Sequence, residues 1–390
     1  METKNVGLYV HIPFCMQKCK YCDFKSYAGK ENLIKEYVEC LKYEIEKVGK
    51  EVKQDYQNGL DDLVTIDTIY IGGGTPSYIN ENYIYEIMCK IQENFVLKDN
   101  IEITIEANPG TVNEAKLKRY VDSKINRISF GLQSTQERLL KQLGRIHTYE
   151  EFEEAYNLAR KVGFNSINVD LMIGLPTQTL EDVTKALEKV IKLNPEHISV
   201  YSLIVEENTP LYEDVKAKKL ILPEDDEERK MYWKVKEILE KCGYVHYEIS
   251  NFSKKGYESK HNLHCWEQEE YIGLGAAAHS YTNDVRYSNV CEIEKYIQNY
   301  KENREEENFI FHERQNKQTK MQEYMLLGLR KIEGVNIQKF KEKFGEDPIF
   351  IYSEKLNRLA KNNLIEIKED FICLSKKGLD LANIVWQEFV

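Results

Sequence analysis

Three cysteines, Cys15, Cys19 and Cys22, stand close together near the start of the chain. Cysteines at such short spacing are typical of metal or redox sites in a reducing compartment. On a continuous helix they would form one apolar stripe, but Pro13 and the polar residues between them favour a loop. Tetrahedral zinc would need a fourth ligand, for which His11 is the nearest candidate. Three thiolates without an obvious fourth ligand suit a [4Fe–4S] cluster better, with one iron left open to a small-molecule ligand.

Further polar or glycine-rich residues follow four segments that we expect to be strands. They are Gly72, Gly73, Gly74 and Thr75, then Glu106, Gln133 and Asp170. Because ligands bind at the carboxyl ends of parallel strands, these residues are expected to meet at one site. Each is also a common turn or cap residue, so the pattern alone leaves both interpretations open.

The elements that must position these residues are predicted by hydrophobic periodicity. Short β-branched runs lie at residues 6–12, 65–74, 101–109, 127–134, 167–174 and 197–205, and apolar segments of helical period separate them. This alternation predicts six βα units around a buried parallel sheet. Six units favour a partial barrel over a flat doubly wound sheet, although periodicity alone does not decide between them.

The composition restricts the class of protein. The 390 residues are 42% hydrophobic and carry a net charge of −11, which indicates a globular chain and argues against a general binder of nucleic-acid phosphates. No stretch approaches 18 consecutive apolar residues, and no signal-peptide core follows Met1. Nine cysteines, odd in number and mostly isolated, make a poor disulfide framework. A cytoplasmic protein without a transmembrane segment is therefore expected.

The C-terminal part of the chain has a different order of elements. Two helical segments, a hairpin that turns at Glu369 and Asp370, and a last helix predict a winged-helix-like α+β domain over residues 318–390. Residues 301–317 are charged and lack apolar periodicity, which predicts a linker. From Met321 to Val390 there are 11 Lys and Arg against 11 Asp and Glu, so DNA binding is disfavoured and a structural or lid role is expected.

Several motifs together resemble a known family. The Cys15, Cys19 and Cys22 motif, with Tyr21 before the last cysteine, resembles the radical S-adenosylmethionine (SAM) superfamily, in which SAM chelates the open iron of a [4Fe–4S] cluster. Over nearly the whole chain the sequence resembles the oxygen-independent coproporphyrinogen III oxidase family. The segments that carry this resemblance are YVHIPFC, GGGTP, IEANP, SFGLQS, GRIH, NVDLMIGLP and HNLHCW. It implies a partial (β/α)6 radical SAM barrel over residues 1–300.

The resemblance assigns roles to the polar residues by position. It implies contacts to cluster-bound SAM from Tyr9, Gly73, Gly74, Thr75 and Glu106. Gln133, Arg145 and Asp170 match positions that hold a second SAM, or shape its pocket, in the oxidase. These assignments are chemically reasonable, because a carboxylate can bind ribose hydroxyls or an ammonium group and Arg145 can bind a carboxylate.

The family has two branches, and departures from the oxidase pattern favour the HemW-type heme chaperones. The oxidase motif continues to a fourth cysteine where this chain has Phe24, and the oxidase carries a long N-terminal extension where only eight residues precede Tyr9. The chaperone branch carries a heme motif, His-Asn-x-x-Tyr-Trp, which matches His261 to Trp266 except that Cys265 replaces tyrosine. Imidazole and thiolate both ligate heme iron, so His261, His264 and Cys265 remain candidates, with Trp266 expected to pack on the porphyrin.

The resulting hypothesis is a heme chaperone with three ligands. A [4Fe–4S] cluster, SAM and heme are expected, with heme bound in an extension at about residues 206–300. The heme would be passed to an acceptor hemoprotein, and this acceptor can be membrane-associated. An electron donor is needed only if SAM is cleaved, and no nucleic-acid partner is expected. The alternative is an enzyme of the coproporphyrinogen III dehydrogenase type, which decarboxylates propionates by radical chemistry.

Overall fold

The computed structural model describes residues 3–59 and 63–390, and its centre is a parallel sheet. The parallel strands are β1 (Thr3–Ile12), β2 (Leu63–Gly73), β3 (Val96–Ala107), β4 (Arg127–Gln133), β5 (Ser166–Ile173) and β6 (His197–Ser202). Each pairs in parallel with the next along the chain. Most of their valine and isoleucine residues are buried, as expected for a sheet covered on both faces. The six predicted strands are confirmed.

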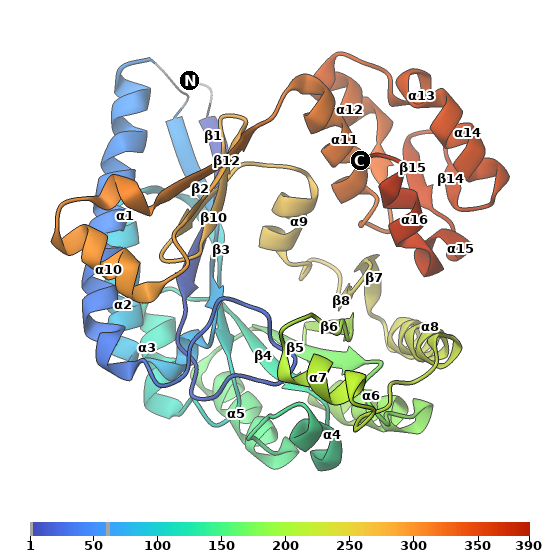
Figure 1. The fold of residues 1–390 in the computed structure, drawn as a ribbon, viewed down its shortest axis with the longest axis horizontal. Coiled ribbons are helices and arrows are strands. Elements are labelled where there is room, and N and C mark those ends of the chain that lie inside the picture. Colours follow the sequence, from blue (N-terminus) through green and yellow to red (C-terminus); the bar gives the residue numbers. More distant parts are fainter. Residues whose placement is uncertain (1–2, 60–62) are drawn as a thin grey trace.

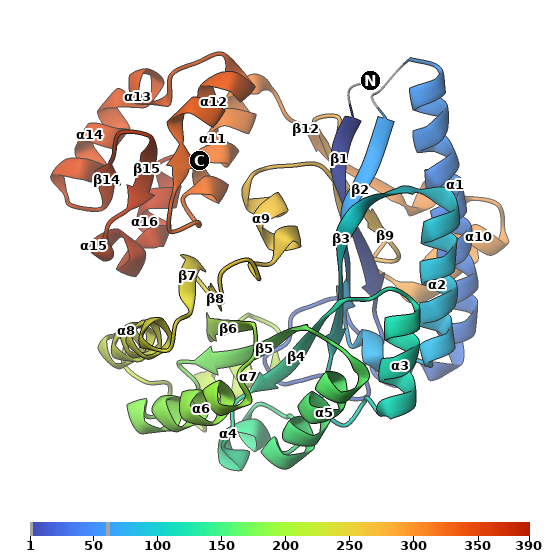
Figure 2. The same ribbon diagram turned by 180° about the vertical axis from the view of Figure 1, so that it is seen from behind.

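Helices cover the outer face of this sheet (Figures 1 and 2). They are α1 (Ile34–Gln57), α2 (Glu81–Asn94), α3 (Glu114–Asp122), α4 (Glu137–Gln142), α5 (Tyr149–Val162) and α6 (Leu180–Leu193), with short 3-10 helices at Glu31–Leu33 and Pro76–Tyr78. Capping boxes formed by Thr148 with Glu151 and by Thr179 with Asp182 fix where α5 and α6 begin.

The sheet continues beyond the six parallel strands on both sides. Next to β1 lie β9 (Tyr271–Leu274), β10 (His279–Thr282), β11 (Val285–Asn289) and β12 (Phe309–Arg314), and next to β6 lie β8 (Asn251–Ser253) and β7 (Val245–Glu248). The twelve strands end at β12 on one side and β7 on the other, so the sheet curves without closing (Figure 1). The partial barrel is therefore confirmed.

One helix lies inside the curve of the sheet. After α7 (Pro210–Lys216) and α8 (Asp225–Lys241), the chain forms α9 (Lys260–Trp266), which contacts β2 and lies between the sheet and the C-terminal part of the chain (Figures 1 and 2). The Ser259 side chain caps its start. The sequence His261 to Trp266 is thus presented from a helix on the inner side of the barrel.

The segment predicted to be a linker contains regular structure. Helix α10 (Ile293–Lys301) is followed by a 3-10 turn at Glu305–Asn308 and by β12, which pairs antiparallel with β11. All six side chains of β12 are exposed, so apolar patterning could not reveal this edge strand. The proposed boundary at residues 301–317 stays a prediction.

The C-terminal residues form a second unit with its own hydrophobic core. Its helices are α11 (Lys317–Gly328), α12 (Ile337–Phe344), α13 (Pro348–Ile351), α14 (Ser353–Lys361), α15 (Lys376–Asp380) and α16 (Ala382–Gln387), and its strands are β13 (Val335–Asn336), β14 (Ile365–Ile367) and β15 (Phe371–Leu374). The β14–β15 hairpin turns where Glu369 and Asp370 predict it. The winged-helix-like order of elements is confirmed.

Candidate functional site

The three cysteines lie in a loop that directly follows β1. Residues 13–30, all of them described, contain no helix, so the helical stripe is excluded. The loop is tied down by its backbone: the Cys15 amide donates to the Tyr27 carbonyl at 2.9 Å, and the Lys20 amide donates to the Leu143 carbonyl at 2.9 Å. These bonds fix the loop, in which Cys15 is buried and Cys19 and Cys22 are half-buried.

The sulfur atoms have the surroundings that an iron–sulfur cluster requires. All three cysteines are free and line one cavity of about 130 Å³. Arg145 Nη1 lies 3.4 Å from Cys19 Sγ, and Thr75 Oγ1 lies 3.6 Å from Cys15 Sγ, so donors are available to a negatively charged cluster. Within the described residues, no three His, Cys, Asp or Glu side chains converge as a single metal ion would require. The arrangement disfavours mononuclear zinc and fits a larger group.

The cavity with the cysteines also gathers most of the residues predicted to contact SAM. Its lining includes Gly73, Gly74, Thr75, Glu106, Gln133, Arg145 and Asp170. They come from β2, β3, β4, β5 and the loops after β2 and α4. Asp170 differs slightly from expectation, because it lies within β5 rather than after it. The predicted convergence is observed, and the individual roles remain proposals.

Gly73 occupies a position that only glycine can fill. Its φ angle is +114°, and a Cβ atom there would lie 2.5 Å from the ring of His11. The backbone N–H of Gly73 donates to Glu106 Oε2 at 3.2 Å. Glycine thus permits the close packing of backbone and carboxylate that a small ligand would use.

Glu106 is an acid of this site, and its pKa is raised. Tyr70 donates its hydroxyl hydrogen to Glu106 Oε1 at 2.7 Å, opposite the bond from Gly73. Burial, with a smaller contribution from the charge of Asp170, raises the Glu106 pKa to about 7. The carboxyl group can therefore change its charge near neutral pH and would be stabilised as an anion by a bound cation.

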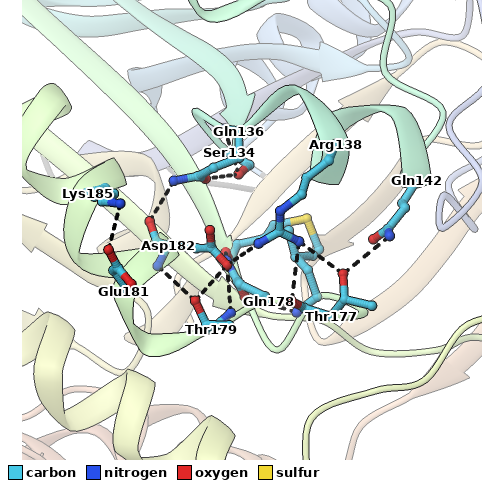
Figure 3. A network of polar contacts seen from close by, with 12 residues as sticks. Ser134, Gln136, Arg138, Gln142, Thr177, Gln178, Thr179, Glu181, Asp182 and Lys185 are labelled. Carbon is cyan, nitrogen blue, oxygen red and sulfur yellow. Dashed lines mark hydrogen bonds and ion pairs between the residues drawn. The ribbon is translucent and has the colours of Figure 1, made fainter.

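Arg145 and Asp170 line the cavity and are also hydrogen-bonded to neighbouring residues. Arg145 donates to Asn108 Oδ1 at 2.8 Å and to the Gly131 carbonyl, while Asp170 accepts from Asn168 Nδ2 at 2.7 Å. Figure 3 shows the polar network that ties the loops after β4 and β5 together, with Arg138 bridging to Thr177 and Asp182. The carboxyl ends of β4 and β5, the strands that contain Gln133 and Asp170, are thereby tied to each other.

A second cavity, of about 500 Å³, adjoins the first. It is lined by Tyr9, His11, Asp23, Phe24, Lys25, Gly73, Glu106, His261, Cys265, Tyr271, Ala277 and His279. Gly73, Glu106 and Phe24 line both cavities. Tyr9, predicted to contact SAM, lines only this larger cavity, which has a volume within the usual range for small-molecule sites.

His261 is oriented by contacts from β2 and β3. Its Nδ1 lies 2.9 Å from Thr68 Oγ1, its ring stacks on Tyr70 at 5.2 Å, and its backbone N–H donates to Glu102 at 3.1 Å. Burial lowers the pKa of His261 to about 3, so the imidazole is neutral at physiological pH. In the described part of the chain Nε2 has no hydrogen-bond partner and is free to coordinate a metal.

The other residues of the predicted heme motif separate into different roles. Cys265 lies one helical turn after His261 and also lines the cavity, and burial raises its thiol pKa to about 11. The Nε2 atom of His264 lies 2.6 Å from the Glu270 carbonyl and its Nδ1 lies 3.5 Å from Asp67, so this ring is engaged in structural contacts. Trp266 does not line the cavity and instead packs against Arg330, 4.3 Å from its ring centroid. Sequence reasoning missed Tyr271 and the place of His11 in this cavity, for which its two-residue spacing from the predicted Tyr9 on a strand is the only available signal.

Replacing Trp266 with alanine is expected to loosen the C-terminal unit while the affinity for heme stays unchanged. Loss of the cation–π contact with Arg330 and of apolar burial should lower the free energy of unfolding by about 1–3 kcal/mol. Thermal unfolding and limited proteolysis within residues 301–317 measure the first effect, and heme titration measures the second. A large loss of heme affinity in a protein of unchanged stability would contradict this assignment.

Comparison with known proteins identifies the family. The model of the radical SAM superfamily matches residues 9–190, and that of the HemN C-terminal domain matches residues 315–381. The heme chaperone HemW of Lactococcus lactis is 36% identical over 390 residues, which cover 100% of this chain and 98% of that protein. The heme chaperone HemW of Bacillus subtilis is 38% identical, covering 98% of both. The chain belongs to the HemW family.

A solved structure agrees with the fold of this HemW family member. Coproporphyrinogen III oxidase (HemN) from Escherichia coli matches with a TM-score of 0.82 and 23% identity, covering 99% of this chain and 90% of that chain. At this identity the match shows the fold alone. Membership of the radical SAM superfamily brings a [4Fe–4S] cluster and SAM as the cofactors of the HemW chain. The cysteine loop and the adjoining cavity have suitable donors for both.

Proposed function

We propose that the protein is a heme chaperone, which binds heme in the larger cavity with His261 as an iron ligand and passes it to an acceptor hemoprotein. The observation that carries this proposal is the neutral His261 ring, anchored through Nδ1 with Nε2 free, beside a cavity of about 500 Å³. A hydrogen bond at one ring nitrogen fixes the tautomer and orientation of a metal-binding imidazole. The HemW relatives support the proposal through their named function.

The cluster and SAM are assigned to the smaller cavity, next to the heme site. Cys15, Cys19 and Cys22 hold a [4Fe–4S] cluster, which supplies an open iron for SAM. The Gly73 backbone and the Glu106 carboxylate then bind polar groups of SAM, and Arg145 balances negative charge beside Cys19. Since Gly73 and Glu106 also line the larger cavity, SAM bound by them would lie next to heme, as a structural or gating ligand would.

The proposal also covers the compartment in which the protein works and the acceptor that receives heme. Helices long and apolar enough to cross a bilayer are absent from residues 3–59 and 63–390. We place the chaperone in the cytoplasm, which suits nine free cysteines. The acceptor is a hemoprotein that can be membrane-associated, and an electron donor is required only if SAM is cleaved.

Heme titration of the wild type, His261→Ala and Cys265→Ala tests the function. His261→Ala should weaken heme binding by about 10–100-fold or more, because losing even an outer-shell partner of a metal ligand has an effect of that size. Cys265→Ala is the matched control from the same helix face and should bind heme nearly as the wild type does. Equal affinities in all three proteins would remove His261 from the site. Production of protoporphyrinogen from coproporphyrinogen III, SAM and a reductant would contradict chaperoning as the sole function.

A further inference from the structure

Three histidines line the larger cavity, and they differ in how their ring nitrogens are used. His11 has both nitrogens engaged, at 2.9 Å from the Tyr9 hydroxyl and 2.9 Å from the Lys25 carbonyl. His261 has one nitrogen engaged by Thr68. His279 has no ring hydrogen bond to any residue in the ranges 3–59 and 63–390. His261 and His279 are thus the two imidazoles of this cavity that can bind a metal.

His279 of β10 packs closely against a glycine, Gly273, of the neighbouring strand β9. Tyr9 of β1 pairs with Gly273 of β9, and Gly273 lies against His279 of β10. A Cβ atom at Gly273 would lie 2.1 Å from the His279 carbonyl oxygen, so a larger residue cannot occupy this place. The His279 backbone and the Ala278 side chain fill the place that a side chain at Gly273 would take. This close packing fixes the backbone of His279 against β9, while the His279 side chain lines the larger cavity.

The His279 ring is held in place by a second imidazole. It stacks on His312 of β12 with ring centroids 5.3 Å apart and an angle of 12° between the planes. His312 Nε2 in turn lies 2.8 Å from Ser288 Oγ. The stack orients the ring but leaves its nitrogens unpaired.

The two available histidines differ in their access to solvent. His261 is only 7% exposed, whereas His279 belongs to the exposed residues. Heme iron has two axial positions, and an exchange of heme between proteins must release both in turn. An accessible ligand can be replaced by an incoming side chain while a buried ligand still holds the iron.

We propose that His279 is the second axial ligand of the heme iron and the ligand that an acceptor displaces first. This inference rests on the proposed function, since it assumes that heme binds in the cavity with His261. His261 then retains the iron until the acceptor has supplied its own first ligand. Coordination uses neutral imidazole lone pairs and requires no redox step.

The spin state of bound ferric heme tests the assignment. The wild type should show a six-coordinate low-spin spectrum in visible absorption and electron paramagnetic resonance. His279→Ala should lose the low-spin signal, become five-coordinate and high-spin, and recover the low-spin signal when free imidazole is added. His312→Phe is the matched control, because it keeps an aromatic ring for stacking but removes the neighbouring imidazole, and its spectrum should stay low-spin. A low-spin spectrum of His279→Ala without imidazole would overturn the inference.

Transfer kinetics test the order of displacement. His279→Ala loaded with heme should release it to an excess of an apo-globin faster than the wild type does, and added imidazole should slow the release again. An unchanged rate would overturn the role of His279 in transfer. If the proposed function itself fails, heme affinity will be independent of His261. If only this inference fails, heme affinity will depend on His261, but the spin state of the bound heme will be the same in His279→Ala as in the wild type.

Discussion

Replacing any one of Cys15, Cys19 and Cys22 with alanine should abolish the [4Fe–4S] cluster and, with it, high-affinity binding of SAM. Three thiolates are the complete protein ligand set of the proposed cluster, so no remaining side chain can compensate. Iron and acid-labile sulfide content, the charge-transfer absorption and the electron paramagnetic resonance signal after reduction measure the cluster. Calorimetric titration measures SAM binding. Each variant should lose all of these signals.

The same variants are expected to keep the fold and the affinity for heme. The cysteine loop is anchored through backbone hydrogen bonds to Tyr27 and Leu143, and the cysteines do not line the larger cavity. Cys40→Ala on α1 is the matched control, since Cys40 is another buried thiol but lies outside both cavities. A Cys19→Ala protein with a full complement of iron and sulfide would refute the ligand assignment.

Glu106→Gln is expected to stabilise the cofactor-free protein at alkaline pH and to weaken SAM binding. In the folded protein the Glu106 pKa is about 7, above the ordinary value of 4.5, because burial disfavours the charged carboxylate. The folded state therefore binds more protons than the unfolded state between about pH 4.5 and 7, and the free energy of unfolding falls as pH rises through that window. A shift of this size corresponds to at most about 3 kcal/mol.

Chemical denaturation between pH 4 and 9 measures this effect. The wild type should lose stability with rising pH and level off above about pH 7, whereas Glu106→Gln should lack this component and be more stable at pH 8 by about 1–3 kcal/mol. SAM affinity should fall by about 10–100-fold, as expected for loss of a charged hydrogen bond. Glu44→Gln offers a control, since Glu44 is also buried with a raised pKa but accepts from Tyr296 and does not line either cavity. If Glu44→Gln weakens SAM binding as strongly as Glu106→Gln does, the effect is not specific to the site.

Local sequence patterns predicted the elements that are determined by neighbouring residues in the sequence. The six parallel strands, the helices between them and the hairpin at Glu369 and Asp370 follow from periodicity and turn residues. The neighbours of these strands could not be predicted in the same way. Strand β9 inserts between β1 and β10 although about 260 residues separate it from β1, and no local signal encodes such a pairing.

The cysteine ligands could be predicted from their motif, but the residues that face the larger cavity depend on side-chain orientation and could not. The spacing of Cys15, Cys19 and Cys22 and their convergence with Glu106 and Asp170 agree with expectation. The orientation of Trp266 differs from expectation. Successive residues on a helix point in directions about 100° apart, so only His261 and Cys265, which are one turn apart, face the cavity. The importance of His279 depends on Gly273 and His312, which sequence alone does not place beside it.

The larger cavity is lined by residues from two parts of the chain. The smaller cavity and one side of the larger one, from Tyr9 to Glu106, lie within the superfamily match at residues 9–190, whereas His261 and His279 lie beyond it. Only Gly73, Glu106 and Phe24 belong to both compartments. Cargo selection can thus diversify by mutation in the later segment while the cofactor machinery stays unaltered. An engineered exchange of residues 250–290 between relatives would be the economical way to redirect this scaffold toward another tetrapyrrole.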